Sequence, residues 1–126
     1  MVYADTDFFV ALVKDDDWLQ ENAVKILDEN EGEIETSLPT FIELCFLAED
    51  YDWDLERAVT NILQIAEVDF QENVVYQALE YIDQGLNVLD AFQLAKSKGS
   101  IISSDKEFDK TDVERIYLED GEQFII

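Results

Sequence analysis

The chain has 126 residues, of which 31 are acidic and only eight are basic, giving a formal net charge of −23 at pH 7. Its apolar content of 48% is too high for a disordered acidic chain, so we expect one folded domain over residues 1–126. No apolar run approaches the roughly 20 residues of a membrane-spanning helix, and no leader-like N-terminus is visible, which predicts a cytoplasmic protein without a membrane partner. Histidine is absent and Cys45 is the single cysteine, which excludes an internal disulfide and argues against a zinc site of nitrogen and sulfur ligands.

The charge itself favours a protein from a high-salt cytoplasm. Repulsion among surface acids is tolerable where salt screens it, because the Debye length falls to about 3 Å at 1 M salt. A nucleic-acid mimic and an acidic partner of a basic protein are the alternatives. Charge alone does not separate these three interpretations.

In the first half of the chain, short apolar runs alternate with helical spacing, which predicts an α/β domain. The expected elements, in order, are a strand over Val2–Ala4, a helical face from Phe8, a helix over Asp17–Glu29, a weak strand over Glu33–Ser37, a helix with Pro39 in its first turn, a helix from Leu55 to Ala66, and a strand over Val68–Phe70. The expected helix over Asp17–Glu29 would place four apolar residues on one side: Trp18, Ala23, Ile26 and Leu27.

The second half continues the same alternation. A helical face runs from Val74 to Ile82, with Gly85 as the left-handed residue that closes it. Asn87 is the expected N-cap of a helix running to Lys98, which Gly99 closes. The remaining elements are a strand over Ser100–Ser103, a helical turn over Lys106–Lys110 and a strand over Val113–Leu118, while the apolar end, Phe124–Ile126, is unexplained.

Four acids interrupt apolar runs, where an unpaired carboxylate would be costly: Asp5, Glu43, Asp90 and Asp105. Asp5 and Asp105 each follow a short strand, and Glu43 and Asp90 each lie in the first turns of a helix. In an open parallel sheet these positions meet at the carboxyl edge, so the four acids are expected to form a cation site.

Each acid also has a purely structural explanation. Asp90 would occupy the N3 position after Asn87, where the helix dipole favours an acid. Asp5 and Asp105 would cap the turns that follow them, and Glu43 would point into water.

The order of these segments resembles the PIN domain nucleases, particularly the VapC-type toxins of toxin–antitoxin pairs. The matching pieces are Val2–Phe9, where the family has an Asp-Thr-Asn opening, then Leu38–Leu44, Leu89–Ala95 and Ile102–Phe108. The resemblance implies a three-layer α/β/α fold with a short central parallel sheet of about four to five strands.

The same resemblance implies site residues. The acidic metal ligands of the family carry over to Asp5, Glu43, Asp90 and Asp105, and its usual hydroxyl carries over to Ser103. Thr6, Asp7 and Ser103 would surround the ligands without binding the metal directly. Asp7 departs from the family, where Asn is commoner, and its extra charge either joins the metal shell or reflects the acidic composition.

Oxygen ligands select hard cations, so the expected cofactor is Mg²⁺ or Mn²⁺. The resemblance implies that the reaction is hydrolysis of RNA, in which such a cation would activate a bound water. Lys106 and Lys110 are the candidate RNA contacts nearest the site, although both also fit a solvated surface. The implied partners are an antitoxin and a second copy of the chain. The alternatives are a non-catalytic or RNA-processing PIN domain, an acidic interaction module, and a haloacid-dehalogenase-type phosphatase that would use Asp5-Thr6-Asp7.

Overall fold

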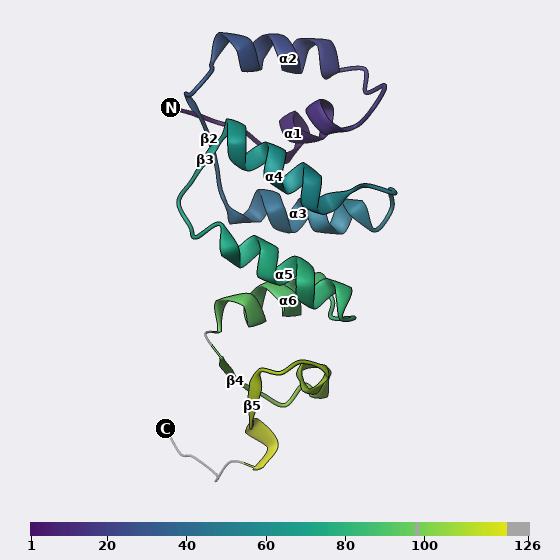
Figure 1. Cartoon of the computed structure of the whole chain (residues 1–126), viewed down its shortest axis with the longest axis vertical. Coiled ribbons are helices and arrows are strands. Elements are labelled where there is room, and N and C mark those ends of the chain that lie inside the picture. Colours follow the sequence, from purple (N-terminus) through teal and green to yellow (C-terminus); the bar gives the residue numbers. More distant parts are fainter. Residues whose placement is uncertain (98, 121–126) are drawn as a thin grey trace. The chain divides into compact units, whose positions relative to one another are not determined.

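The computed structural model describes residues 1–97 and 99–120. The chain divides into two compact units, Met1–Asn73 and Val74–Ile126, and each is described by itself. Figure 1 labels their elements in chain order, with the first unit in purple to teal and the second in green to yellow.

The first unit places four helices around a small parallel sheet. Its elements are β1 (Val2–Tyr3), α1 (Thr6–Val13), α2 (Gln20–Glu29), β2 (Ile34–Thr36), α3 (Leu38–Ala48), α4 (Leu55–Ile65) and β3 (Glu67–Val68). The sheet has the strand order β1-β2-β3, and the register pairs Tyr3 with Glu35 and Glu35 with Glu67. Parallel pairing brings the carboxyl ends of the three strands to one edge.

The core of this unit consists of side chains at helical spacing on α1, α3 and α4. Phe9, Phe41, Leu44 and Val59 have no exposed surface, and the Phe41 ring meets the Phe70 ring edge-on at 5.5 Å. Cys45 is 3% exposed and belongs to the same core. Burial, assisted by the negative charge of Glu49, raises the pKa of its thiol to about 12.

The prediction for the second helix is wrong at its start. The helix begins at Gln20 rather than Asp17, because the Asp17 carboxylate accepts a hydrogen bond from the Leu19 N–H and holds a turn there. Trp18 therefore precedes α2 and is 86% exposed, so it contributes nothing to the predicted apolar side.

The second unit contains α5 (Asn73–Asp83), which begins at the unit boundary, α6 (Val88–Lys96), β4 (Ser100–Ser103), a 3₁₀ turn η1 (Lys106–Lys110), β5 (Glu114–Tyr117) and a second 3₁₀ turn η2 (Leu118–Asp120). Asn87 caps α6 as predicted, since its side chain accepts a hydrogen bond from the Asp90 N–H. Gly85 has a φ of 104°, which confirms the left-handed closure predicted after α5. Of the predicted helix over Asn87–Lys98, residue 98 lies outside the described residues, as does the apolar segment Phe124–Ile126.

The expected single sheet of four to five strands is wrong for the described residues, because the largest sheet there has three strands. β4 and β5 pair with each other in parallel as a separate two-stranded sheet. Apolar runs indicate where strands lie but not which strand each one pairs with, so the sequence pattern could not reveal this division. The three-layer arrangement stays a prediction.

Among the described helices, none combines the length and the apolar character that crossing a bilayer requires.

Candidate functional site

Asp5 lies at the carboxyl edge of the first unit's sheet, directly before α1. It is the N-cap of that helix, and one carboxylate oxygen accepts a hydrogen bond from the Thr6 N–H at 2.6 Å. Its other oxygen accepts no hydrogen bond from the described residues, and the side chain is exposed. The capping role predicted for Asp5 is therefore confirmed, and it leaves one oxygen free for a ligand.

A buried pair of threonines ties the same edge together. The Thr36 hydroxyl donates to the Ala4 carbonyl at 3.0 Å and lies 2.8 Å from the Thr40 hydroxyl. Because a carbonyl only accepts, the proton of Thr36 goes to Ala4 and Thr40 must donate to Thr36. One hydroxyl chain thus joins the end of β1, the end of β2 and the first turn of α3.

This arrangement predicts that Thr36→Val lowers the free energy of unfolding by about 1–3 kcal/mol, because the Ala4 carbonyl and the Thr40 hydroxyl would be left buried and unpaired. Denaturant unfolding in concentrated KCl measures the change.

The matched control is Thr6→Val. The Thr6 side chain is equally buried, at 3% exposure, but its hydroxyl has no hydrogen-bond partner among the described residues. The control should keep or raise stability. Equal losses in both variants would show that the threonine chain contributes nothing.

Glu43 lies in the second turn of α3, whose start is held at the sheet edge by Thr40. Its side chain is exposed and forms no hydrogen bond or ion pair with the described residues. Pro39 stands at the start of the helix, as predicted, where its missing N–H costs nothing. Asp7, in the first turn of α1, is also exposed.

Asp90 lies in the first turn of α6 in the second unit and is half-buried. Its backbone N–H donates to the Asn87 side chain at 2.9 Å, and its Oδ2 accepts from the Asn87 Nδ2 at 2.8 Å. This reciprocal cap confirms the N3 position. Oδ1 accepts no hydrogen bond from the described residues.

Asp105 follows β4 and caps η1. Its Oδ1 accepts a hydrogen bond from the Glu107 N–H at 2.9 Å, and its own N–H donates to the Ser103 hydroxyl at the same distance. The second carboxylate oxygen has no donor among the described residues, and the side chain is exposed. Ser103, predicted from the resemblance, therefore contacts the Asp105 backbone and shapes the turn.

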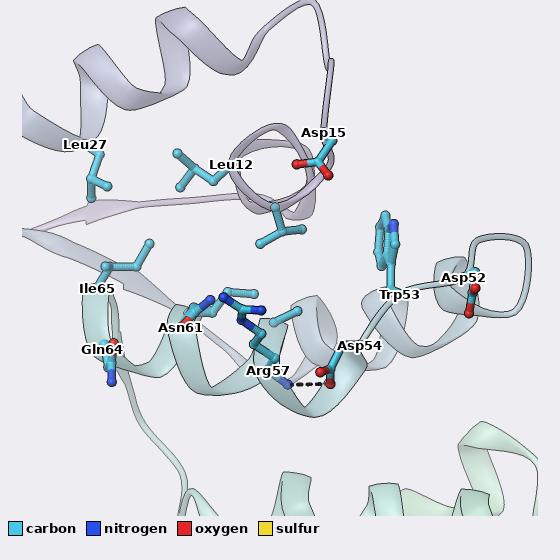
Figure 2. Close-up of a pocket in the computed structure, with 13 residues that line it drawn as sticks. Leu12, Asp15, Leu27, Asp52, Trp53, Asp54, Arg57, Asn61, Gln64 and Ile65 are labelled. Atoms are coloured by element: carbon cyan, nitrogen blue, oxygen red, sulfur yellow. Dashed lines mark hydrogen bonds between the residues drawn. The ribbon is translucent and has the colours of Figure 1, made fainter.

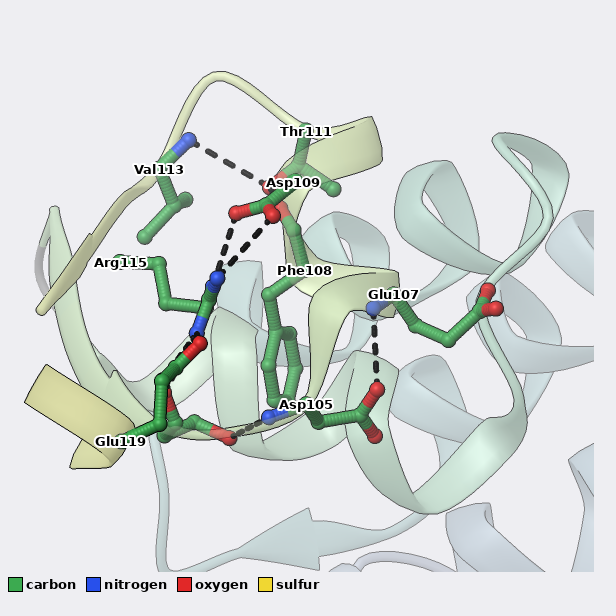
Figure 3. A network of polar contacts seen from close by, with 9 residues as sticks. Asp105, Glu107, Phe108, Asp109, Thr111, Val113, Arg115 and Glu119 are labelled. Carbon is green, nitrogen blue, oxygen red and sulfur yellow. Dashed lines mark hydrogen bonds and ion pairs between the residues drawn. The ribbon is translucent and has the colours of Figure 1, made fainter. Parts of the chain in front are cut away.

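Arg115 on β5 is a polar centre that the sequence reasoning missed (Figure 3). Its guanidinium binds Asp109 through Nε at 2.8 Å and Nη2 at 3.2 Å, while Nη1 donates to the Ser103 carbonyl at 2.8 Å and to Glu119 at 3.0 Å. The side chain is only 4% exposed. The sequence did contain a signal for this centre. Arg115 is one of only two arginines in a very acidic chain, and it lies inside the predicted strand Val113–Leu118.

These contacts shift the titration of both acids in the direction expected of ion pairs. Hydrogen bonds from Arg115 hold the pKa of the Asp109 carboxyl below its ordinary value. A hydrogen bond with its own backbone N–H, followed by those from Arg115, lowers the pKa of Glu119. The two carboxylates in turn raise the pKa of Arg115, so the cluster is fully ionised at neutral pH.

The two lysines considered for RNA contact lie on η1 and are exposed. Lys110 already forms an ion pair with Glu107. Lys106 has no ion-pair partner among the described residues, and its charge contributes to the lowered pKa values of Asp109 and Glu119. RNA contact by these lysines stays a prediction.

A pocket of about 630 Å³ lies within the first unit, between α1, α2 and α4 (Figure 2). Leu12 and Leu27 supply apolar surface from α1 and α2, Arg57 and Ile65 line the pocket from α4, and Trp53 lies just before that helix. Its lining includes neither Asp5 nor Glu43, so the pocket is distinct from the predicted site residues of that unit.

The expectation that the four acids are enclosed in apolar surroundings is wrong for Asp5, Glu43 and Asp105, which are exposed, and holds in part for Asp90. Strand ends and helix starts turn a polar side chain outward even when its sequence neighbours are buried. Within the described residues of either unit, no three acidic or cysteine side chains already form a cluster able to hold a metal.

Comparison with known families places these residues in context. Residues 2–114 match the PIN domain model, which covers Asp5, Glu43, Asp90 and Asp105, and the chain belongs to this family. PIN domains are usually nucleases that use divalent metals. No curated protein and no solved structure matches the chain.

Proposed function

We propose that this protein is a metal-dependent endoribonuclease in which Asp5, Glu43, Asp90 and Asp105 bind Mg²⁺ or Mn²⁺. Family membership over residues 2–114 supports the reaction class. The observation that carries the residue assignment is that each of the four side chains keeps a carboxylate oxygen that no described residue uses. Oxygen-only donors of this kind suit hard divalent cations.

The donor set fits such a cation without rebuilding the local structure. In Asp5, Asp90 and Asp105 one oxygen is engaged by an N–H of a helix start or cap, which orients the carboxylate and leaves the other oxygen available. A bound divalent cation would supply a water of lowered pKa and neutralise charge that develops on the phosphodiester.

The side chains have separable parts in this chemistry. Asp5, Asp90 and Asp105 act as principal ligands, and Glu43, which has no other partner among the described residues, binds the cation or orients the attacking water. Thr6, Asp7 and Ser103 each lie within two residues of one of these ligands in the sequence. Because the chain contains no histidine, general-base catalysis by imidazole has no place in the mechanism.

We further propose a VapC-type toxin in a high-salt cytoplasm, paired with an antitoxin and forming a homodimer. The net charge of −23 supports the high-salt setting, and the resemblance of the matched segments to such toxins supports the toxin role and its partners. An RNA-processing or non-catalytic PIN domain is the second candidate, and a purely acidic interaction module the third. Membership in the PIN family removes the ground for the phosphatase reading of Asp5-Thr6-Asp7.

The test is incubation of a mixed RNA pool with the protein in multimolar KCl, with Mn²⁺ or with EDTA. We expect discrete cleavage products that depend on Mn²⁺ and disappear with EDTA. Sequencing of the new RNA ends would identify the target. Intact RNA after incubation with a protein whose circular dichroism shows it folded would count against catalysis and favour the non-catalytic PIN domain.

A further inference from the structure

We propose that Arg115 is a positioning residue for Asp105, and through it for the divalent cation that Asp105 would bind. This inference rests on the proposed nuclease function, because it assigns a supporting role within that site. Among the described residues, the carboxylate of Asp105 accepts one hydrogen bond, from the Glu107 N–H, and the side chain is exposed. The Asp105 N–H donates to the Ser103 hydroxyl, so the position of the carboxylate follows that of the backbone between Ser103 and η1.

Arg115 grips the chain on both sides of Asp105. Before it, the Ser103 carbonyl at the end of β4 accepts from Nη1 at 2.8 Å. After it, the Asp109 carboxylate on η1 accepts from Nε and Nη2 at 2.8 and 3.2 Å. Both ends of the turn that carries Asp105 are thus fixed to one planar group, and Figure 3 shows the contact with Asp109.

The connection needs such a clamp because it is short. β4 and β5 run parallel, with Ser103 in register with Tyr117, and residues 104–113 alone connect them. A parallel crossover generally uses about a dozen or more residues and a full helix. Here one 3₁₀ turn, anchored by the buried Phe108, takes the place of the helix. The hydrogen bonds within the crossover are local, such as those of Thr111 with Phe108 and Val113, so Arg115 adds a tie between the crossover and the sheet.

Arginine suits this position better than lysine. The guanidinium presents five N–H donors in a fixed plane, so it serves a carboxylate, a carbonyl and a second carboxylate at once. Glu119 on η2 accepts from Nη1 at 3.0 Å, and the Tyr117 ring lies 4.2 Å from the guanidinium carbon. A lysine ammonium, as a single point, cannot reach acceptors spread around the edge of that plane.

The experiment measures Mn²⁺ binding by titration calorimetry in concentrated KCl for the native chain, Arg115→Lys and Asp105→Asn. The control is Arg57→Lys, which changes the other arginine, an exposed residue of α4 whose guanidinium has no ion pair among the described residues. We expect Arg115→Lys to weaken Mn²⁺ binding by about 10–100-fold, the usual range for a group that orients a metal ligand, and Arg57→Lys to leave it unchanged. In cleavage assays kcat should fall while KM for RNA stays the same.

Asp109→Asn is the second variant, in case Arg115→Lys fails to fold. Its side chain is 46% exposed, so the substitution is milder, and it weakens the grip on one side of Asp105 only. We expect a loss of Mn²⁺ affinity smaller than that of Arg115→Lys. Folded variants with lowered Tm but native Mn²⁺ affinity would overturn the inference while the proposed function stood. A folded native chain that binds no Mn²⁺ would overturn both.

Discussion

Replacing Asp90 by Asn should lower Mn²⁺-dependent RNA cleavage by about 100-fold or more, because a neutral amide is a poor ligand for a hard cation. The fold should tolerate the change. The amide oxygen of Asn can still accept the hydrogen bond that Asn87 now donates to Asp90 at 2.8 Å. Loss of one negative charge near the start of α6 costs only about 0.3–1 kcal/mol through the helix dipole. Cleavage rates and thermal melting of the same preparations measure the two effects.

The matched control for this substitution is Asp28→Asn, on the exposed surface of α2. It removes the same charge with the same change of shape and should leave cleavage unchanged. Stabilisation by Mn²⁺ at fixed ionic strength gives an independent reading, since a cation that binds only the folded chain raises Tm. Asp90→Asn should lose that gain. If it retained full metal-dependent cleavage, the assignment of Asp90 as a ligand would be wrong.

Raising KCl from 0.1 M to 2 M should stabilise the protein by about 2 kcal/mol or more, corresponding to a rise in Tm of roughly 8 °C. The cause is the excess of 31 acidic over eight basic residues. At low salt these charges repel one another through the folded surface, and most have no cation to pair with. Circular dichroism melting across the KCl series at pH 7 gives the dependence.

The shape of that dependence separates screening from general salting-out. The Debye length is about 10 Å at 0.1 M and about 3 Å at 1 M, so screening should deliver most of the gain below about 1 M. An excluded osmolyte such as sucrose strengthens apolar burial without screening and serves as the control. A Tm that rises linearly with KCl throughout, matched by sucrose, would attribute the effect to exclusion. A Tm independent of KCl would contradict the high-salt interpretation.

Local chemistry made several elements predictable from the sequence. Asn87 capped α6 and Gly85 closed α5 with a left-handed backbone, because these residue types satisfy helix ends in ways that few others can. The strand Ser100–Ser103 and the turn Lys106–Lys110 have the predicted bounds. The capping roles considered for Asp5 and Asp105 were also confirmed.

Features that depend on distant residues were not predictable in this way. The division of the described strands between two sheets depends on which strands pair, which no local pattern encodes. Trp18 was assigned to an apolar face and is exposed, because one hydrogen bond to Asp17 delays the start of α2. The exposure of Asp5 and Asp105 could not be predicted from their apolar sequence neighbours, because the backbone changes direction where a strand ends. The role of Arg115 required knowing that Ser103, Asp109 and Glu119 meet around it.

The position of Arg115 has a practical consequence for comparing or trimming such chains. The match to the PIN family ends at residue 114, one residue before this arginine. A chain shortened to the matched region would retain Asp5, Glu43, Asp90 and Asp105. It would lose the Arg115 guanidinium, which binds Asp109 and the Ser103 carbonyl. Family alignments that stop at the same boundary would likewise leave out the side chain that we propose to position Asp105.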